Sequence, residues 1–152
     1  QGNQGCNGGL MDDAFTYLIK NGGSCTEASY PYKGVDGTCQ TCTPAATLKS
    51  FTDVKAGSEP DLMTALANGP ISVAIQANQM AFQFYTGGVL TGRCGRQLDH
   101  GVLVVGSGTD GSNDYWRIKN SWGASWGEKG YIRIVRGQDE CGVADAASWP
   151  SV

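Results

Sequence analysis

Residues 115–136 read YWRIKNSWGASWGEKGYIRIVR, and this stretch decides the fold class. Apolar and polar residues alternate over Tyr115–Ser121 and again over Tyr131–Arg136, which is the period of a half-buried strand. The segment between them, GASWGEKG, is rich in glycine and is typical of a turn. The stretch therefore predicts two strands that belong to a β-rich second half of the chain.

The regions before this stretch predict three more strands and two helices. Strands are expected near Leu48–Val54, over the alternating Ile71–Ile75, and over His100–Ser107, an apolar run that we expect to be buried. Apolar residues recur with helical spacing over Met11–Ile19, and a second helix is expected to start at Ser58 and continue through Leu66. Helices that come first and strands that follow favour an α+β fold with a mostly antiparallel sheet or barrel.

Composition and charge exclude several classes of partner. The chain has 152 residues and a net charge of -3, and it contains no run of lysine and arginine, so nucleic acid is not an expected partner. No apolar stretch approaches the length needed to span a bilayer, so no membrane partner is expected. The chain begins with Gln1 and shows no signal-peptide pattern, so we expect that it opens partway through a protein.

One histidine and one asparagine are the residues most suggestive of chemistry. His100 is the only histidine, and it stands at the start of a predicted strand, where a cleft is easily reached. A lone histidine is more often structural than catalytic, but Asn120 follows twenty positions later within KNSWGASWG. The alternative for that segment is a turn held together by its aromatic residues, which would need the tryptophans but not the asparagine. The residues alone leave both interpretations open.

The motifs of this chain resemble those of papain-family cysteine proteases from Gln1 to Val152, and the cathepsin L branch in particular. They are, in order, GCNGGLMDDAF, YPY, GPISVAI, DHGVLVVG, YWRIKNSWGASWGEKGYIRI and ECGVADAASWP. The resemblance implies the papain-like two-lobed α+β fold. Residues 1–45 would be a remnant of the helical first lobe and the crossover, and residues 46–152 would form the mostly antiparallel, β-barrel-like second lobe.

The resemblance also implies catalytic roles for two residues and a covering role for a third. His100 would be the general base and acid of a Cys–His pair, and Asn120 would orient its imidazole through a side-chain amide. Trp122 would cover that hydrogen bond from water and help to form the leaving-group side of the cleft. A nearby imidazolium stabilises a thiolate, which is the reactive form of cysteine.

The segment that supplies the family's nucleophile and its oxyanion-stabilising glutamine has no match here. Cys25 lies in NGGSCTEASYPY, with no tryptophan after it and no glutamine in register before it, so we reject it as the nucleophile. We therefore expect a cysteine endopeptidase in the complete protein and no activity from this chain without the N-terminal segment of the same protein. The alternative is a non-catalytic or serine-nucleophile relative with a structural or templating role.

Nine residues match positions that contact substrate in the family. Gly8 and Gly9 resemble the strand that pairs with the substrate backbone, although from the sequence alone a plain loop before a helix is the better explanation. An apolar pocket for the second residue before the scissile bond would be lined by Leu10, Met11, Ala74, Leu98 and Ala146, with Asp99 and Trp122 beside the scissile bond. Asp145 is expected to point away from this pocket.

The six cysteines are consistent with a disulfide-permissive compartment. The resemblance implies a bridge between Cys94 and Cys141 and leaves Cys6 and Cys39 without their family partners. Cys25 and Cys42 flank one loop, so an additional bridge is expected between them. No cofactor and no metal is implied. The partners implied are peptide or protein substrates and protein inhibitors, in a lysosomal, vacuolar or secreted setting.

Overall fold

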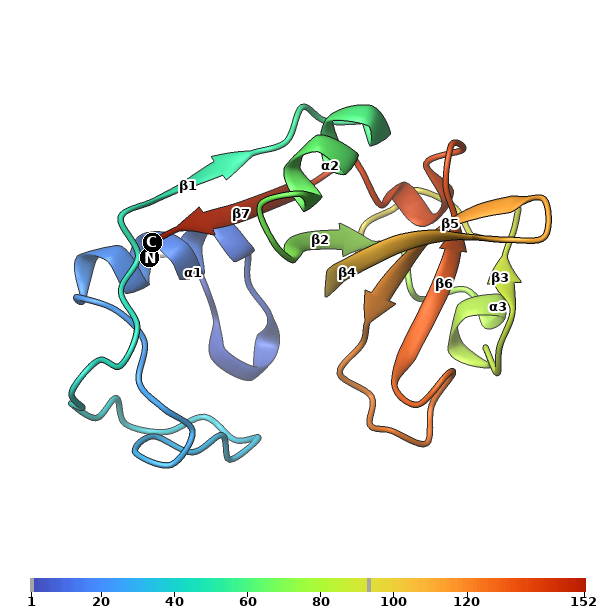
Figure 1. Cartoon of the computed structure of the whole chain (residues 1–152). Helices are drawn as coiled ribbons and strands as arrows, with labels where there is room; N and C mark the ends of the chain where they lie inside the picture. Colours follow the sequence, from blue (N-terminus) through green and yellow to red (C-terminus); the bar gives the residue numbers. More distant parts are fainter. Residues whose placement is uncertain (1, 93) are drawn as a thin grey trace. The chain divides into compact units, whose positions relative to one another are not determined.

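The computed structural model describes residues 2–92 and 94–152, and Figure 1 shows its course. The chain divides into two compact units. One extends to Thr52 and includes Pro150–Val152, and the other is Asp53–Trp149. The boundary runs through two strands, β1 (Ser50–Asp53) and β7 (Ala147–Ser151). Each unit is described by itself.

The first unit contains one helix and a long irregular segment. The 3-10 turn η1 (Gly5–Asn7) precedes α1 (Met11–Lys20), which confirms the predicted helix. Asp12 and Asp13 stand in its first turn and Lys20 in its last, as the helix dipole favours, and no residue of α1 is buried. The segment from Gly22 to β1 carries little regular structure.

The second unit is built on a sheet. Its strands are β2 (Ile71–Ile75), β3 (Val89–Leu90), β4 (His100–Asp110), β5 (Asn113–Lys119) and β6 (Tyr131–Val135). With β1 and β7 the order is β1-β7-β2-β4-β5-β6-β3. The pairs β2–β4, β4–β5 and β5–β6 are antiparallel, and β3 pairs with β6 in parallel. The predicted α+β class with a mostly antiparallel sheet is confirmed.

Three short helices complete this unit: α2 (Glu59–Leu66), α3 (Met80–Gln83) and the 3-10 turn η2 (Glu140–Gly142). The Ser58 hydroxyl accepts the Asp61 N–H and caps α2, so the predicted start of this helix is confirmed. The buried Glu59 carboxylate accepts the indole N–H of Trp116 at 2.7 Å. This bond ties the first turn of α2 to β5.

The core lies in the second unit. Its fully buried side chains come from α2, α3, four strands and the segment after η2, and include Leu62, Ile71, Ile75, Phe82, Trp116, Ile118, Ile132, Ile134 and Val143. The expectation of a buried strand over His100–Ser107 was wrong in part. The strand forms and runs on to Asp110, but Val104 is its only fully buried residue, because the other face of β4 is partly open.

Among the described residues, none of the helices has the length and apolar character that crossing a membrane would require.

Candidate active site

The β4–β5 hairpin explains why His100 and Asn120 meet although twenty positions separate them. His100 is the first residue of β4 and lies opposite Ile75 of β2. Asn120 directly follows β5, whose Lys119 lies opposite Leu103 of β4. An antiparallel pair brings the start of one strand beside the end of the next, so both side chains stand at the same end of the hairpin.

A hydrogen bond joins the two side chains. His100 Nε2 and Asn120 Oδ1 lie 2.8 Å apart. The backbone N–H of Ser121 donates to the same Oδ1, also at 2.8 Å, so that atom is an acceptor and the amide orientation is fixed. His100 must therefore donate from Nε2, which leaves Nδ1 as the nitrogen able to exchange a proton with another group.

Asn120 is held through its backbone as well as through its side-chain oxygen. The residue is only 8% exposed, and its backbone N–H donates to the carbonyl of Gly130 at 3.0 Å. Its Nδ2 is buried and has no hydrogen-bond partner among the residues that the structure describes. The rigid amide serves as an acceptor that orients the imidazole without placing a charge beside it.

Aromatic rings line one side of this pair. The Trp122 ring lies 5.1 Å from the His100 ring, centroid to centroid, and it is 40% exposed. Phe82 and Trp126 meet Trp122 edge to face at 5.4 and 5.3 Å. The indole N–H of Trp126 donates to the Gln83 carbonyl. Trp122 thus shields the imidazole, and the rings behind it fix its position.

The other expected site residues of the second unit gather where β2 meets β4. Ala74 lies opposite Gly101, and its N–H donates to the Ala146 carbonyl at 2.9 Å. Asp99 directly precedes His100, but its carboxylate accepts the backbone N–H of Ala77 at 2.7 Å. Its side chain therefore fixes the segment after β2, and its backbone N–H donates to the Ile75 carbonyl.

Asp145, expected to point away from the pocket, forms an ion pair. Arg96 Nε donates to Asp145 Oδ2 at 2.9 Å, and Arg96 Nη2 donates to the other carboxylate oxygen. This Nη2 also lies 2.6 Å from Asp139 Oδ2. The hydrogen bonds from Arg96 hold the pKa of Asp145 below its usual range, so this carboxylate is ionised and paired.

The remaining expected substrate residues, Gly8, Gly9, Leu10 and Met11, belong to the first unit. The backbone of Gly8 is in the left-handed region, with φ of 100°. A Cβ on Gly9 would lie 2.3 Å from Asn3 Oδ1, because the Asn3 amide bonds both the N–H and the carbonyl of Leu10. Leu10 is 66% exposed. Close packing of Asn3 is thus a local reason for glycine at position 9.

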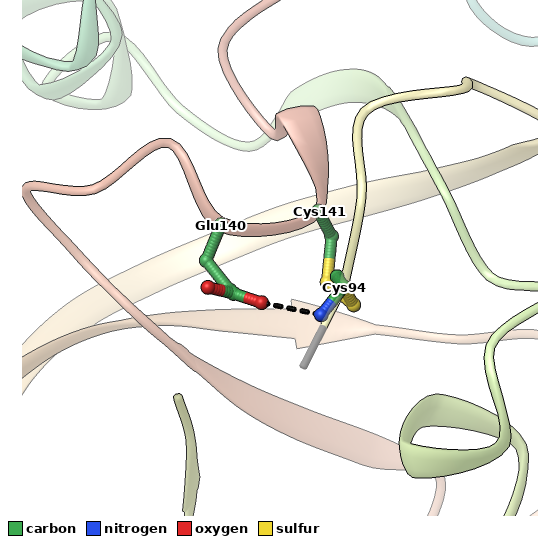
Figure 2. A group of neighbouring side chains, drawn as sticks. All are labelled: Cys94, Glu140 and Cys141. Carbon is green, nitrogen blue, oxygen red and sulfur yellow. Dashed lines mark hydrogen bonds between the residues drawn. A yellow bond between two sulfur atoms is a disulfide. The ribbon is translucent and has the colours of Figure 1, made fainter. Parts of the chain in front are cut away.

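Two disulfides occur at the pairs expected from the sequence, Cys25–Cys42 and Cys94–Cys141. Figure 2 shows that Glu140 approaches the second bridge, and the three side chains present donor atoms within 4.8 Å of one another. The bridge consumes both thiols, however, and the Glu140 carboxylate accepts the N–H groups of Cys94 and Gly92 at 2.7 and 2.9 Å. This cluster is a cross-link with a buried carboxylate rather than a set of metal ligands.

The free cysteines of the described chain are Cys6 and Cys39, and both are exposed. A hydrogen bond to Asp36 raises the pKa of the Cys6 thiol, the opposite of what a nucleophile needs. Cys39 lies 3.6 Å from the Tyr17 hydroxyl. Neither residue lies in the unit that holds His100, and Cys25 is already in a disulfide.

Sequence reasoning missed several residues that shape the site. The Ser121 N–H that orients Asn120 is a backbone group, so no pattern of side chains in the sequence predicts it. Trp126 could have been found, because the repeated SWG motif places a second tryptophan close to Asn120. Arg96 could not, since its partner is 49 positions away. Phe82 likewise comes from a distant element, α3, and carries no motif of its own.

Comparison with known proteins gives a consistent result. The sequence model described as "Papain family cysteine protease" matches residues 1–151. Vignain of Ricinus communis is 52% identical over 157 residues, which cover 97% of this chain and 43% of vignain. Cathepsin L of Sarcophaga peregrina is 53% identical over 158 residues, which cover 99% of this chain and 47% of that protein. The chain spans less than half the length of either relative.

Solved structures agree with the sequence relatives. The bromelain protease of Ananas comosus, in complex with an inhibitor, matches with a TM-score of 0.94 and 40% identity, covering 99% of this chain and 73% of that one. Procathepsin L 3 of Tenebrio molitor larval midgut matches with a TM-score of 0.94 and 44% identity, covering 99% of this chain and 51% of that one.

Proposed function

Because this chain belongs to the papain family of cysteine proteases, we propose that the complete protein hydrolyses peptide bonds with His100 as its general base and acid. One observation carries the proposal. His100 donates from Nε2 to an Asn120 oxygen whose orientation the Ser121 N–H fixes. The Ser121 bond makes Asn120 Oδ1 an acceptor, so it selects the tautomer of His100 that carries its proton on Nε2. A catalytic histidine needs this selection, because Nδ1 must be free to take a proton from its partner.

The proposed reaction uses Nδ1 of His100 twice. The imidazole first takes a thiol proton, and the thiolate then adds to the carbonyl carbon of the scissile bond. As the C–N bond breaks, the imidazolium gives that proton to the leaving amine. His100 next takes a proton from the water that attacks the thioester carbonyl. As the C–S bond breaks and the acid product leaves, the imidazolium returns that proton to the thiolate and the thiol is restored. Asn120 carries no charge, so it orients the ring throughout without favouring either protonation state.

We propose that the nucleophile is a cysteine outside this chain, and that this chain alone is inactive. Support comes from the cysteines that the chain does contain. Four are in disulfides, and the hydrogen bond to Asp36 raises the pKa of the free Cys6 thiol, which disfavours the reactive thiolate. A serine nucleophile, or a relative without catalysis, is the alternative. The retained His100–Asn120 bond argues against a relative that has lost all catalysis.

We further propose that the substrate pocket selects an apolar residue at the second position before the scissile bond. Ala74, Leu98 and Ala146 supply small or aliphatic side chains, and the family resemblance assigns the apolar Leu10 and Met11 to the same pocket. Gly8, Gly9 and Asp99 would offer backbone groups to the substrate, and Trp122 would flank the leaving group. Residues 1–45 would be the remnant of the first lobe and the crossover, and residues 46–152 would be the second lobe.

The setting in which the protein acts is proposed from its relatives and its disulfides. Two bridges in so short a chain suit a lysosomal, vacuolar or secreted location. Peptide and protein substrates would be the partners. Protein inhibitors that bind at the substrate site would be a second class of partner.

Hydrolysis of matched peptidyl amides by the complete protein tests the proposal. Substrates with leucine or phenylalanine at the second position before the scissile bond should have a higher kcat/KM than the matched substrate with arginine there. The His100→Ala variant should lose at least about a hundredfold in kcat/KM, and residues 1–152 alone should give no turnover. Full activity in His100→Ala would refute the role of His100, and a preference for arginine would refute the apolar pocket.

A further inference from the structure

A surface arginine forms ion pairs with two acidic side chains beside the proposed pocket. The Arg96 guanidinium binds both oxygens of Asp145 and lies 2.6 Å from Asp139 Oδ2. The Arg96 side chain is 57% exposed, whereas those of Asp139 and Asp145 are 12% and 23% exposed. The acids thus lie inward and the cation outward. Because a guanidinium fork matches a carboxylate, both hydrogen bonds to Asp145 form at once.

The loop that carries Arg96 is held in place independently of this ion pair. The Cys94–Cys141 bridge and the bond from the Cys94 N–H to Glu140 anchor its start. The Gln97 N–H donates to Gln76 Oε1 at 2.9 Å and anchors its end. Removing the Arg96 side chain should therefore leave the loop in position and change mainly the local charge.

The Asp145 carboxylate lies beside residues of the proposed pocket. A Cβ placed on Gly142 would lie 2.8 Å from Leu98 Cδ2 and 3.0 Å from Asp145 Oδ2, so both atoms approach the same point. Asp145 also directly precedes Ala146, whose carbonyl is bound by the Ala74 N–H. Asp145 Oδ2 and Leu98 Cδ2 thus flank one point, which makes the carboxylate a neighbour of the proposed apolar wall.

We propose that Arg96 is a specificity-determining residue, which keeps the pocket apolar by occupying Asp145 and so excludes arginine and lysine from it. This inference rests on the proposed protease function. An unpaired carboxylate at a pocket wall attracts a cation and disfavours an apolar side chain, whereas a carboxylate already bound by a guanidinium does neither. Without Arg96, the positive end of a basic substrate residue would take its place on Asp145.

The test measures, for the complete protein, the ratio of kcat/KM for two peptidyl amides that differ only in arginine or leucine at the second position before the scissile bond. Arg96→Gln should raise the arginine-to-leucine ratio about tenfold or more, the worth of one charge-assisted hydrogen bond. The double variant Arg96→Gln with Asp145→Asn should return the ratio to the wild-type value. A merely structural Arg96 would change both rates together and leave the ratio unmoved.

Control variants keep the result interpretable. Arg136→Gln removes the ion pair that Arg136 makes with Asp114 elsewhere in the same unit and should leave the ratio unchanged. Arg96→Met, which keeps the aliphatic stem, should reproduce the raised ratio if Arg96→Gln folds poorly. The inference about Arg96 would be wrong if the arginine-to-leucine ratio were unchanged in both Arg96 variants, or if the raised ratio persisted after Asp145→Asn. Either result would leave the proposed protease function intact. A wild-type protein that cleaves neither substrate would overturn the protease function itself.

Discussion

Asn120 is the residue on which the candidate site depends most directly. Its Oδ1 accepts from both His100 and Ser121, and it is the more deeply buried partner of the pair. A buried amide with a fixed acceptor holds an imidazole more firmly than solvent would, because the alternative rotamers lose a hydrogen bond in a place that water does not reach.

Replacing Asn120 should expose the His100 ring proton to solvent. The chain has one histidine, so its Nε2–H gives one assignable NMR signal. We expect a protected Nε2–H signal in the wild-type chain and its loss through rapid exchange in Asn120→Ala, because the acceptor at 2.8 Å is gone. Asn113→Ala, at the exposed start of β5, is the matched control and should keep the signal. Persistence of the signal in Asn120→Ala would contradict the hydrogen bond.

Residue-level features were predictable only where a motif carries them. The pairing of His100 with Asn120 and the covering by Trp122 follow the family pattern. The ion pairs of Arg96 do not, because they depend on a loop and a turn that only the folded chain brings together. For Gly9, the sequence suggests substrate approach or a plain loop. The packing of Asn3 against this glycine is a third reason, and it is visible only in the folded chain.

The loop that joins β5 to β6 carries both Asn120 and Trp122, and one ion pair closes its far end. Arg133 of β6 donates to both oxygens of the Glu128 carboxylate, at 2.7 to 3.1 Å. Glu128 Oε1 also accepts the N–H of Gly88 at 3.0 Å. Two positions after Glu128, the Gly130 carbonyl accepts the N–H of Asn120, so this end of the loop supports the site.

Glu128→Gln should destabilise the chain in a pH-dependent way. The hydrogen bonds from Arg133 lower the pKa of Glu128 below 4.5, its unfolded value. Its contribution to the free energy of unfolding is therefore fully present above pH 4.5 and is lost as pH falls through the lower folded-state pKa. We expect a cost of about 1–2 kcal/mol at pH 7 that shrinks as the pH drops below 4.5, measured by urea unfolding at a series of pH values.

Asp110→Asn is the matched control for this change. Asp110 is the other acidic partner of Arg133, but its side chain is 57% exposed. An exposed ion pair contributes little, so we expect about 0.5 kcal/mol or less. A Glu128→Gln cost that stays constant down to pH 3, or one no larger than that of Asp110→Asn, would show that the Glu128–Arg133 pair is not what closes the loop.

Elements with a strong period or a cap were predictable, and those defined by their partners were not. The periodic apolar residues of α1 and β2 and the serine cap of α2 are visible in the amino-acid sequence itself. Two strands escaped prediction. β3 has two residues and exists only because it pairs with β6, and β7 contains Pro150, which weakens any strand pattern.

At the scale of the whole molecule, the two units differ in their cores. The second unit buries aliphatic and aromatic side chains from α2, α3 and the strands, whereas α1 of the first unit buries none of its residues. The second unit also holds His100, Asn120 and Trp122. The proposed chemistry therefore belongs to the unit that has the aliphatic and aromatic core, which suits a site that must be rigid.

The central claim is that this chain supplies the histidine and the asparagine of a cysteine protease whose thiol lies outside residues 1–152. The most direct measurement is treatment of the complete protein with a thiol-reactive peptidyl epoxide, followed by peptide mapping of the cysteine that reacts fastest. We expect that cysteine to lie outside the six of this chain, and we expect His100→Ala to slow its modification by about a hundredfold. Fastest modification at Cys25, Cys6 or Cys39, or an equal rate in His100→Ala, would contradict the claim.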